Sequence, residues 1–393
     1  MTVAFRVSQL QEVADLNPSL DASPADDEAV SFLPMSAVDA DGVDAIDTET
    51  RPFREVSKGY TPFITDDVLV AKITPCFENG KIAQAKPTRR FGFGSTEFHV
   101  IRTHRSELDP RYLVYYLRQE RIRKDGERKM TGSAGQRRVP EHFLANLNIP
   151  LPPLPEQRRI AEILDKADAL RAKRRAALAQ LDTLTQSIFL DMFGDPATNP
   201  KGWPVHKIEE VAEIVSGATP RTENDSYWDG DVNWVTPKEL SGVEGMYIGA
   251  TERRITREGL ESCAASILSP GSVLFSSRAP IGHTAICIAP MATNQGFKSF
   301  VPRPHLLEPH FLLFWLRLRR SFLEGLGTGA TFKEVSKAVV ARIELCVPPF
   351  DLQSQFAQRV VALDRIRSVQ RTDRRQLEAL FASLQHRAFR GEL

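Results

Sequence analysis

The stretch that decides the fold is PPLPEQRRIAEILDKADALRAKRRAALAQLDTLTQSIFLDMF, residues 152–193, because the chain carries a second version of it. Residues 348–389 read PPFDLQSQFAQRVVALDRIRSVQRTDRRQLEALFASLQHRAF. A shift of 196 positions superimposes residues 131–193 on 327–389 without a gap, and 15 of the 63 pairs are identical, where chance would give about four. A period this long indicates two tandem domains of the same plan rather than a solenoid.

The identical pairs are spread along the whole overlap and mix polar with apolar residues. They include Ala134/Ala330, Val139/Val335, Pro152/Pro348, Pro153/Pro349, Gln157/Gln353, Asp168/Asp364, Arg171/Arg367, Arg175/Arg371, Gln180/Gln376, Leu181/Leu377, Leu184/Leu380 and Phe193/Phe389. Two domains of one plan favour two similar tasks on one polypeptide.

Each copy predicts a long helix, since neither contains Gly or Pro after its opening prolines and both carry a heptad pattern. In the first copy Ile160, Ala167, Arg174, Leu181 and Ile188 share one heptad position, and Ile163, Leu170, Ala177 and Leu184 share another. In the second copy Phe356, Leu363, Leu377 and Leu384 stand at the first position, and Ile366 and Leu380 at the second. Because 196 is a multiple of seven, both helices keep one register, which predicts that they pack on one another as a coiled coil. Two separate exposed helices are the less favoured alternative, because an amphipathic helix must bury its apolar stripe.

The segments outside the helices mix short strands with short helices. Residues 68–71 predict a strand, Asn79-Gly80 a turn, residues 81–83 a returning strand and residues 111–120 a helix. The pattern recurs from Val273 and from Glu308 at slightly different shifts, as loop-length differences would produce. We therefore expect an α/β (mixed α+β) fold with recurring domains at residues 1–151 and 196–347, and long helices within 152–195 and 348–393.

The bulk composition is that of a globular protein. At 393 residues, 26% charged and 42% hydrophobic, the chain is long enough for two to three cores. Residues 1–18 lack the pattern of a signal peptide, and no run approaches eighteen apolar residues. The four cysteines form no C-x-x-C pair, so reduced thiols and a cytoplasmic location are expected.

The charge is segregated although the net charge is only +1. Residues 1–67 hold 14 acidic and 4 basic residues, a net of −10, whereas residues 68–138 hold 16 basic and 7 acidic residues, a net of +9. A phosphate backbone responds to such a local field, which is compatible with nucleic-acid binding. The alternative is a solvated surface whose charges cancel in three dimensions.

Familiar catalytic motifs are missing from the sequence. It has no Walker A loop, no G-x-G-x-x-G after a strand, no H-E-x-x-H and no G-x-S-x-G. The Asn/Asp-Pro-Pro-aromatic run of amino-methyltransferases is also missing, and the eight histidines are dispersed. The acidic pairs Asp26-Asp27 and Asp66-Asp67 are more typical of turns and caps than of catalysis. No active site can be assembled, and neither a metal site nor a resident cofactor is expected.

Several motifs together resemble the DNA specificity subunit of type I restriction-modification systems, and the likeness spans the whole chain. They are Leu151–Ala161 with the helix that follows, Met192–Pro196, Gly202-Trp203, Gly217–Pro220, Tyr227-Trp228, Trp234, Ser277–Gly282, Asn294–Phe297 and, in the first half, Gly92–Val100. One departure is Phe350–Gln353, where the family more often has Leu-Pro before a Glu-Gln pair.

The resemblance implies a non-catalytic reader of DNA. Residues 1–151 and 196–347 would be target recognition domains, each reading half of a split, asymmetric site in double-stranded DNA. The central helix (152–195) and the C-terminal helix (348–393) would form an antiparallel spacer in a pseudo-twofold internal repeat. They would also dock two methyltransferase subunits that bind S-adenosylmethionine and modify adenine. Separate restriction subunits would supply ATP- and Mg²⁺-dependent translocation and cleavage, and no membrane is involved.

Candidate contact residues follow from the chemistry of DNA, because phosphates need cations and base edges need donors such as Arg. The DNA-binding candidates are Lys72, Lys81, Arg89, Arg90, Arg137 and Arg138 in the first domain and Arg278, His283, Lys298 and Lys333 in the second. For each of them a solvated surface charge is the alternative. Tyr227, Trp228 and Trp234 are candidates for stacking on DNA, although aromatic runs more often close a core. The candidates for helix–helix contact are Ile160, Leu170, Leu181, Leu184, Phe356, Leu363, Ile366, Leu377, Leu380 and Leu384.

Two other classes of protein remain as alternatives. One is a stand-alone DNA-modifying enzyme whose active site is dispersed in the sequence, and methyl transfer or cleavage by the purified chain would identify it. The other is a coiled-coil scaffold without sequence specificity, which would bind DNA regardless of sequence. The sequence does not reveal the target bases, because loop conformation selects them.

Overall fold

A computed structural model describes residues 5–47, 49–133, 135–278, 280–329 and 333–393. The chain divides into two compact units, unit 1 (Met1–Arg175 with Asp373–Leu393) and unit 2 (Ala176–Thr372). Each unit thus combines a mixed α and β domain with part of both long helices, which confirms the expected fold class. The identity Ala134/Ala330 and Ala279 of the Ser277–Gly282 motif lie outside the described residues.

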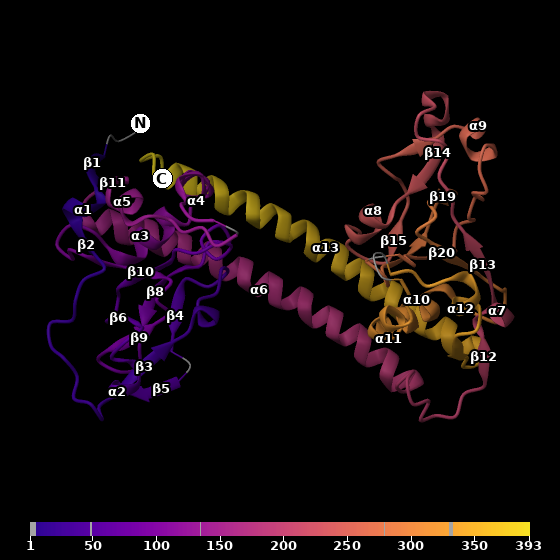
Figure 1. The fold of residues 1–393 in the computed structure, drawn as a ribbon, viewed down its shortest axis with the longest axis horizontal. Helices are drawn as coiled ribbons and strands as arrows, with labels where there is room; N and C mark the ends of the chain where they lie inside the picture. The colour runs from indigo at the N-terminus through magenta and orange to yellow at the C-terminus, as the bar shows by residue number, and fades with distance from the viewer. Residues whose placement is uncertain (1–4, 48, 134, 279, 330–332) are drawn as a thin grey trace. The chain divides into compact units, whose positions relative to one another are not determined.

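Unit 1 is built around a five-stranded sheet of order β2-β10-β7-β8-β4 (Figure 1). A four-stranded sheet of order β5-β3-β9-β6 and the pair β1-β11 complete its strands. The strands are β1 Arg6–Gln9, β2 Ala14–Leu16, β3 Ala29–Leu33, β4 Asp44–Ile46, β5 Glu49–Pro52, β6 Thr61–Phe63, β7 Val68–Ala71, β8 Ile82–Lys86, β9 Gly92–Gly94, β10 Phe98–Thr103 and β11 Asn148–Leu151. The shorter helices are α1 Leu10–Val13, η1 Met35–Ala37, α2 Phe53–Val56, α3 Pro110–Leu117, α4 Glu120–Lys129 and α5 Glu141–Ala145.

Unit 2 repeats the strand order of this main sheet as β13-β20-β17-β18-β15. It adds a three-stranded sheet, β16-β14-β19, and the pair β12-β21. The strands are β12 Val205–Lys207, β13 Ala212–Ser216, β14 Trp228–Val235, β15 Tyr247–Ile248, β16 Arg254–Ile255, β17 Val273–Phe275, β18 Thr284–Cys287, β19 Met291–Thr293, β20 Lys298–Pro302 and β21 Glu344–Cys346. The shorter helices are α7 Ile208–Val211, η2 Asp225–Tyr227, α8 Pro237–Ser241, α9 Arg257–Glu261, α10 Pro309–Leu318, α11 Arg320–Gly325 and α12 Lys337–Ala341.

The predicted short elements lie close to their observed positions. The strand expected at residues 68–71 is β7, and β8 returns antiparallel to it, with Val68 opposite Gln84. The turn at Asn79-Gly80 lies within a longer connection, because β7 ends at Ala71 and β8 begins at Ile82. The helix expected at residues 111–120 divides into α3 and α4.

The helix α3 begins at a strong cap. Asp109 accepts hydrogen bonds from the backbone N–H groups of Arg111 and Tyr112, and Pro110 occupies the first turn, where no N–H is needed. In unit 2 Glu308 caps α10 in the same way, followed by Pro309. Six consecutive residues of α3, from Tyr112 to Leu117, are buried, because this helix forms the centre of the unit 1 core.

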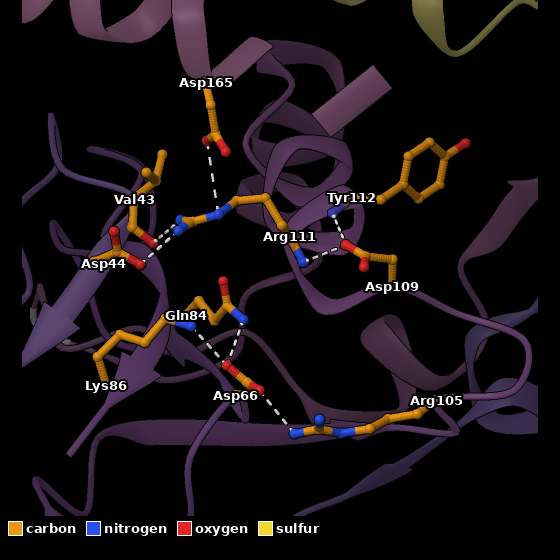
Figure 2. A network of polar contacts seen from close by, with 10 residues as sticks. All are labelled: Val43, Asp44, Asp66, Gln84, Lys86, Arg105, Asp109, Arg111, Tyr112 and Asp165. Atoms are coloured by element: carbon orange, nitrogen blue, oxygen red, sulfur yellow. Dashed lines mark hydrogen bonds and ion pairs between the residues drawn. The ribbon is translucent and has the colours of Figure 1, made fainter. Parts of the chain in front are cut away.

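Polar side chains tie α3 to its surroundings in unit 1 (Figure 2). Arg111 donates to the carbonyl of Val43 at 2.9 Å and pairs with Asp44 at 2.6 Å, and its Nε lies 3.6 Å from Asp165 of the first long helix. In the same view Asp66, which ends the turn before β7, accepts hydrogen bonds from Gln84, Lys86 and Arg105. This carboxylate therefore belongs to a structural network, as expected for an acidic pair at a turn.

The two long helices are α6, Leu154–Phe193, and α13, Phe350–Ala388. They run antiparallel within each unit. In unit 1 Arg171 pairs with Glu378 at 2.5 Å and Arg174 with Asp373 at 3.2 Å. In unit 2 Arg367 pairs with Asp182 at 3.0 Å, and Phe189 packs edge-on against Phe356 with ring centroids 5.4 Å apart. In both units a residue later in α6 pairs with a residue earlier in α13, as antiparallel helices require.

The observed register of the contact between α6 and α13 differs from the register predicted from the heptad pattern. Leu170, Leu184, Ile366 and Leu380 are 52%, 45%, 50% and 51% exposed, so they point outward instead of between the helices. The buried face of α6 instead runs through Gln157, Ala161, Leu164, Asp168, Thr185, Phe189 and Met192, one residue after the expected heptad positions. Ile160 and Phe356 are buried, and Leu181, Leu363, Leu377 and Leu384 are half-buried beside the contact. Polar residues occupy the middle of the contact between α6 and α13. The hydrophobic heptad positions therefore identified residues beside this contact instead of those that form it.

Candidate nucleic-acid interface

One glutamine in each unit holds the mixed domain to its long helix. The side chain of Gln157 accepts a hydrogen bond from the backbone N–H of Asp109 and donates to the carbonyls of Glu107 and Pro152, each at 2.8 Å. In unit 2 Gln353 makes the same three bonds, to Glu308, Leu306 and Pro348, at 2.9, 3.1 and 2.7 Å. Both side chains are fully buried, and together they explain why the repeat keeps a glutamine at this position. The departure from the family motif at Phe350–Gln353 does not disturb this anchor.

Three of the six candidate cations of unit 1 come together beside the end of β7. Lys72 follows this strand, and its carbonyl accepts a hydrogen bond from the N–H of Val139, next to Arg138. Arg138 pairs with Glu97 at 2.7 Å, and Arg137 lies 4.0 Å from Glu127. The hydrogen bond from Arg138 holds the pKa of Glu97 below its usual range, against the opposing effect of burial. Both charges of this ion pair are therefore present at neutral pH.

The other three candidates of unit 1 lie elsewhere. The Lys81 ammonium donates to the carbonyl of Met35 at 3.1 Å, so it braces a loop. Arg89 and Arg90 are exposed in the connection between β8 and β9, where the Arg90 guanidinium lies 4.8 Å from the ring centroid of Phe91. These two arginines remain accessible to a phosphate backbone.

In unit 2 Glu334 gathers two of the four candidates. Arg278 Nε donates to Glu334 Oε2 at 2.7 Å, and the buried Lys298 ammonium lies 3.3 Å from Oε1 of the same carboxylate. Burial favours the neutral acid, but hydrogen bonds from Arg278 and Lys298 outweigh it and lower the pKa of Glu334. Lys333 is exposed next to Glu334.

His283 belongs to a different environment. Its Nε2 lies 3.5 Å from the Arg320 guanidinium of α11, and its backbone N–H donates to the Ser276 hydroxyl at 2.9 Å. Burial, together with the nearby Arg320, lowers the pKa of His283, so the ring is neutral at physiological pH. Its charge contributes nothing to DNA binding there.

A cleft of about 1280 Å³ opens beside the Arg278–Glu334 pair. Its walls carry cationic, acidic and amide side chains, which together can contact phosphates and base edges. Its polar and charged lining residues are Thr236, Lys238, Glu239, Ser241, Glu252, Arg253, Arg278, Asn294, Gln295 and Glu334. Sequence reasoning singled out only Arg278 among these cations, whereas Asn294 and Gln295 stand in a motif that carried the family resemblance.

Two tryptophans, Trp228 and Trp234, pack together behind Arg253 of the cleft wall. Trp234 is buried and meets Trp228 edge-on, with ring centroids 5.2 Å apart. The Arg253 guanidinium lies over both rings, 4.0 Å from the centroid of Trp228 and 5.1 Å from that of Trp234. Trp234 is thus a core residue, and the pair's role is to hold Arg253 in the cleft wall. Arg253 was missed because no motif surrounds it in the sequence.

Comparison with known proteins identifies the family. The model of the type I restriction modification DNA specificity domain matches residues 5–180 and again 200–379. The chain therefore belongs to this family and carries the domain twice. The comparisons give no support to a stand-alone enzyme or a non-specific scaffold.

Individual relatives are similar over part of the chain. A specificity subunit of the type I restriction enzyme MjaIX from Methanocaldococcus jannaschii is 36% identical over 159 residues, covering 40% of this chain and 37% of that protein. The EcoEI specificity subunit of Escherichia coli is 42% identical over 158 residues, covering 40% of this chain and 26% of the relative. The chain thus spans less than half the length of these curated relatives. In fold, it is similar over 98% of its length to the S subunit of a type I system from M. genitalium, with a TM-score of 0.57 and 15% identity over 96% of that structure.

Among the described residues no helix has the length and apolar character required to cross a bilayer. In that same part of the chain no three His, Cys, Asp or Glu side chains are grouped as metal ligands.

Proposed function

We propose that this chain reads a bipartite, asymmetric site in double-stranded DNA for a type I restriction-modification complex. Residues 1–151 and 196–347 act as target recognition domains, and residues 152–195 and 348–393 as the spacer. The observation that carries the proposal is that each unit presents an arginine ion pair beside the same hydrogen-bonded turn, with different residues in the two units. Unequal contact residues on equal scaffolds suit unequal half-sites, since identical ones would read a palindrome.

The contact residues divide by their surroundings into two classes. Arg89, Arg90 and Lys333 are exposed cations suited to phosphates, which fix position without reading sequence. Arg278 lines a cleft with amide side chains beside it, which suits base reading. Lys72 and Arg137 lie at the equivalent turn of unit 1, where Arg138 is bound by Glu97. Lys81, Lys298 and His283 support the loops from behind.

We propose further that the helices dock two methyltransferase subunits through their outward apolar side chains. Unit 1 exposes Leu170 and Leu380, and unit 2 exposes Leu184 and Ile366. The shift of 196 relates Leu170 to Ile366 and Leu184 to Leu380, so both units present the same pair of positions. Aliphatic side chains left exposed at equivalent positions of both units are available to contact a partner. Two equivalent surfaces favour two copies of one partner.

The chemistry belongs to those partners. The methyltransferase subunits bind S-adenosylmethionine, and restriction subunits use ATP and Mg²⁺. This chain selects the DNA sequence at which they act.

The purified chain tests the proposal directly. Alone it should neither methylate nor cleave DNA, and with its methyltransferase partner it should direct adenine methylation to one split motif, read by sequencing methylated adenines. Turnover of S-adenosylmethionine by the chain alone, or methylation without a motif in the complex, contradicts the proposal.

Docking is tested by Leu170→Glu combined with Leu380→Glu, which places two charges on the outward face of unit 1. The stoichiometry measured by native mass spectrometry should fall from two partner subunits to one. Ala169→Glu, a neighbouring exposed position, is the matched control and should leave two subunits bound. A doubly substituted chain that still binds two partners would place docking elsewhere.

A further inference from the structure

The ion pairs of the two units occupy equivalent turns but have opposite polarity. In unit 1 the N–H of Lys72 donates to the carbonyl of Glu97, and Lys72 accepts from Val139. In unit 2 the N–H of Ser277 donates to the carbonyl of Gly296, and Ser277 accepts from Val335. By the same pattern the bridge Thr131↔Arg138 corresponds to Thr328↔Glu334. A cation therefore stands in unit 1 where unit 2 has an acid.

This inversion changes how many nitrogens of each guanidinium are hydrogen-bonded within the protein. In unit 1 both Nε and Nη2 of Arg138 bind the Glu97 carboxylate, at 2.9 and 2.7 Å, and Nη1 donates to the carbonyl of Gln136 at 3.2 Å. All three nitrogens of Arg138 are thus engaged within the protein. The side chain stabilises its turn, and Nη1 and Nη2 are both already bound to acceptors in the protein.

Arg278 of unit 2 is held only from one side. Its Nε donates to Glu334 Oε2, and among the described residues neither Nη1 nor Nη2 has an acceptor. Its side chain is 43% exposed and lines the cleft. Glu334 is fixed in turn by Lys298, whose side chain is only 9% exposed. The guanidinium is therefore oriented from behind, with two parallel donors at its outer end.

Two parallel donors match guanine, whose major-groove edge offers the acceptors O6 and N7 to an arginine fork. A phosphate is a poorer partner at this place, because the Glu334 carboxylate repels a second anion beside the same guanidinium. A positioned fork also loses little side-chain entropy on binding.

We propose that Glu334, anchored by Lys298, positions Arg278 to read one guanine in the half-site recognised by unit 2. The inference rests on the proposed DNA-reading function and adds the base class, the reading residue and its positioning residue. Arg138 has no corresponding role in the other half-site.

The test uses the complex with its methyltransferase partner and a DNA library randomised across both half-sites. Arg278→Ala should reduce discrimination for guanine at one position by about 5- to 150-fold and leave the other half-site unchanged. Arg278→Lys keeps the charge but lacks the fork, so it should lose the same preference while overall affinity changes less. Glu334→Gln should weaken the preference at that same position by a smaller factor and strengthen binding to all sequences, since it removes a repelling charge.

Arg138→Ala is the matched control, and it should alter no base preference by a comparable factor. Amide hydrogen exchange on each variant confirms that the unit remains folded. Three results overturn the inference: a uniform loss of affinity with a smaller salt slope in Arg278→Ala, an affected position that prefers a base other than guanine, or unchanged selectivity in Glu334→Gln. A wild-type complex with no sequence preference would instead overturn the proposed function itself.

Discussion

The two units keep the same residues where a domain meets its helix and different residues where its loops meet. Gln157 and Gln353 make the same three hydrogen bonds, whereas Arg138 and Glu334 place opposite charges at equivalent turns. A buried amide is constrained by all its partners at once, because an unpaired polar group is costly. A turn at the edge of a cleft has no such constraint. Repetition therefore marks the scaffold, and divergence marks the surface that we propose selects DNA.

The middle of the contact between α6 and α13 is only partly repeated between the two units. Arg171 pairs with Asp168 and Glu378 and lies over the ring of Phe381, with 4.2 Å to its centroid. The shift of 196 turns these residues into Arg367, Asp364, Asp182 and Thr185. Arg367 pairs with both acids and donates to the Thr185 hydroxyl at 3.1 Å. The charges are repeated, but a hydroxyl stands where unit 1 has an aromatic ring.

The largest expected effect comes from lengthening the helices. Inserting seven residues after Arg175 and seven after Thr372, where the chain passes from one unit to the other, adds two turns, about 10 Å, to each helix and preserves the contacts within both units. If the helices set the spacing, the methylated motif should keep both half-sequences while its gap grows by about three base pairs. Affinity should fall somewhat, because three base pairs also rotate one half-site by about 100°. Sequencing of methylated adenines measures the gap.

An insertion into α6 alone is the control, since it destroys the pairing of the two helices. That variant should lose site-specific methylation altogether. Full activity at unchanged spacing in the doubly lengthened chain would show that the helices do not determine the distance.

The repeated anchor predicts equal losses in the two units. Gln157→Leu and Gln353→Leu each remove three buried hydrogen bonds at nearly constant volume, and we expect each to destabilise its own unit by about 2–4 kcal/mol. Amide hydrogen exchange resolves the units separately. Gln180→Leu is the matched control, because this glutamine is also repeated but exposed, and it should change stability by less than about 0.5 kcal/mol. A marked loss in only one unit would show that the two anchors are not equivalent.

The sequence predicted the repeat, the mixed fold, the long helices and the family, because these depend on patterns that extend over many residues. It did not predict the register of the helix contact. The arginines and acids at the centre of that contact look like a solvated face when only hydrophobicity is counted. Whether such a charged side chain is buried depends on its partner in the other long helix, which is distant in the sequence.

The candidate DNA contacts were predicted only by residue type. The sequence cannot show that Lys298 is buried, that Lys81 binds a backbone carbonyl or that each guanidinium nitrogen of Arg138 binds Glu97 or Gln136. Each of these outcomes depends on which loop lies opposite, and loop conformation is set by the folded domain.

Arg171 and Arg367, at the centre of the contact between the long helices, should contribute differently to the free energy of unfolding. Arg367 has a side chain only 4% exposed, whereas that of Arg171 is 17% exposed and its partner Glu378 is 41% exposed. Removing Arg367 leaves Asp364, the Leu181 carbonyl and the Thr185 hydroxyl without their buried partner, so Arg367→Ala should destabilise unit 2 by about 3 kcal/mol. For Arg171→Ala the buried Asp168 keeps the nearby cations Arg118 and Arg175, and solvent screens Glu378, so the cost to unit 1 should be about 1 kcal/mol. Hydrogen exchange in each unit tests the difference, and equal losses would contradict the burial argument.

The smallest effect is a pH dependence that the two units should share despite their opposite polarity. The hydrogen bond from Arg138 lowers the pKa of Glu97, and bonds from Arg278 and Lys298 lower that of Glu334 against the effect of burial. A lowered carboxyl pKa stabilises the folded state above the unfolded value of about 4.3, and this contribution is lost as the pH falls through the lower folded value. The stability difference between wild type and Glu97→Gln, or Glu334→Gln, should therefore be constant from about pH 8 to 5 and shrink below about pH 4.3. Denaturant unfolding at several pH values measures it. A difference that shrinks already between pH 7 and 5 would mean that these carboxylates are not held ionised by their cations, and the inverted ion pairs would not be equivalent structures.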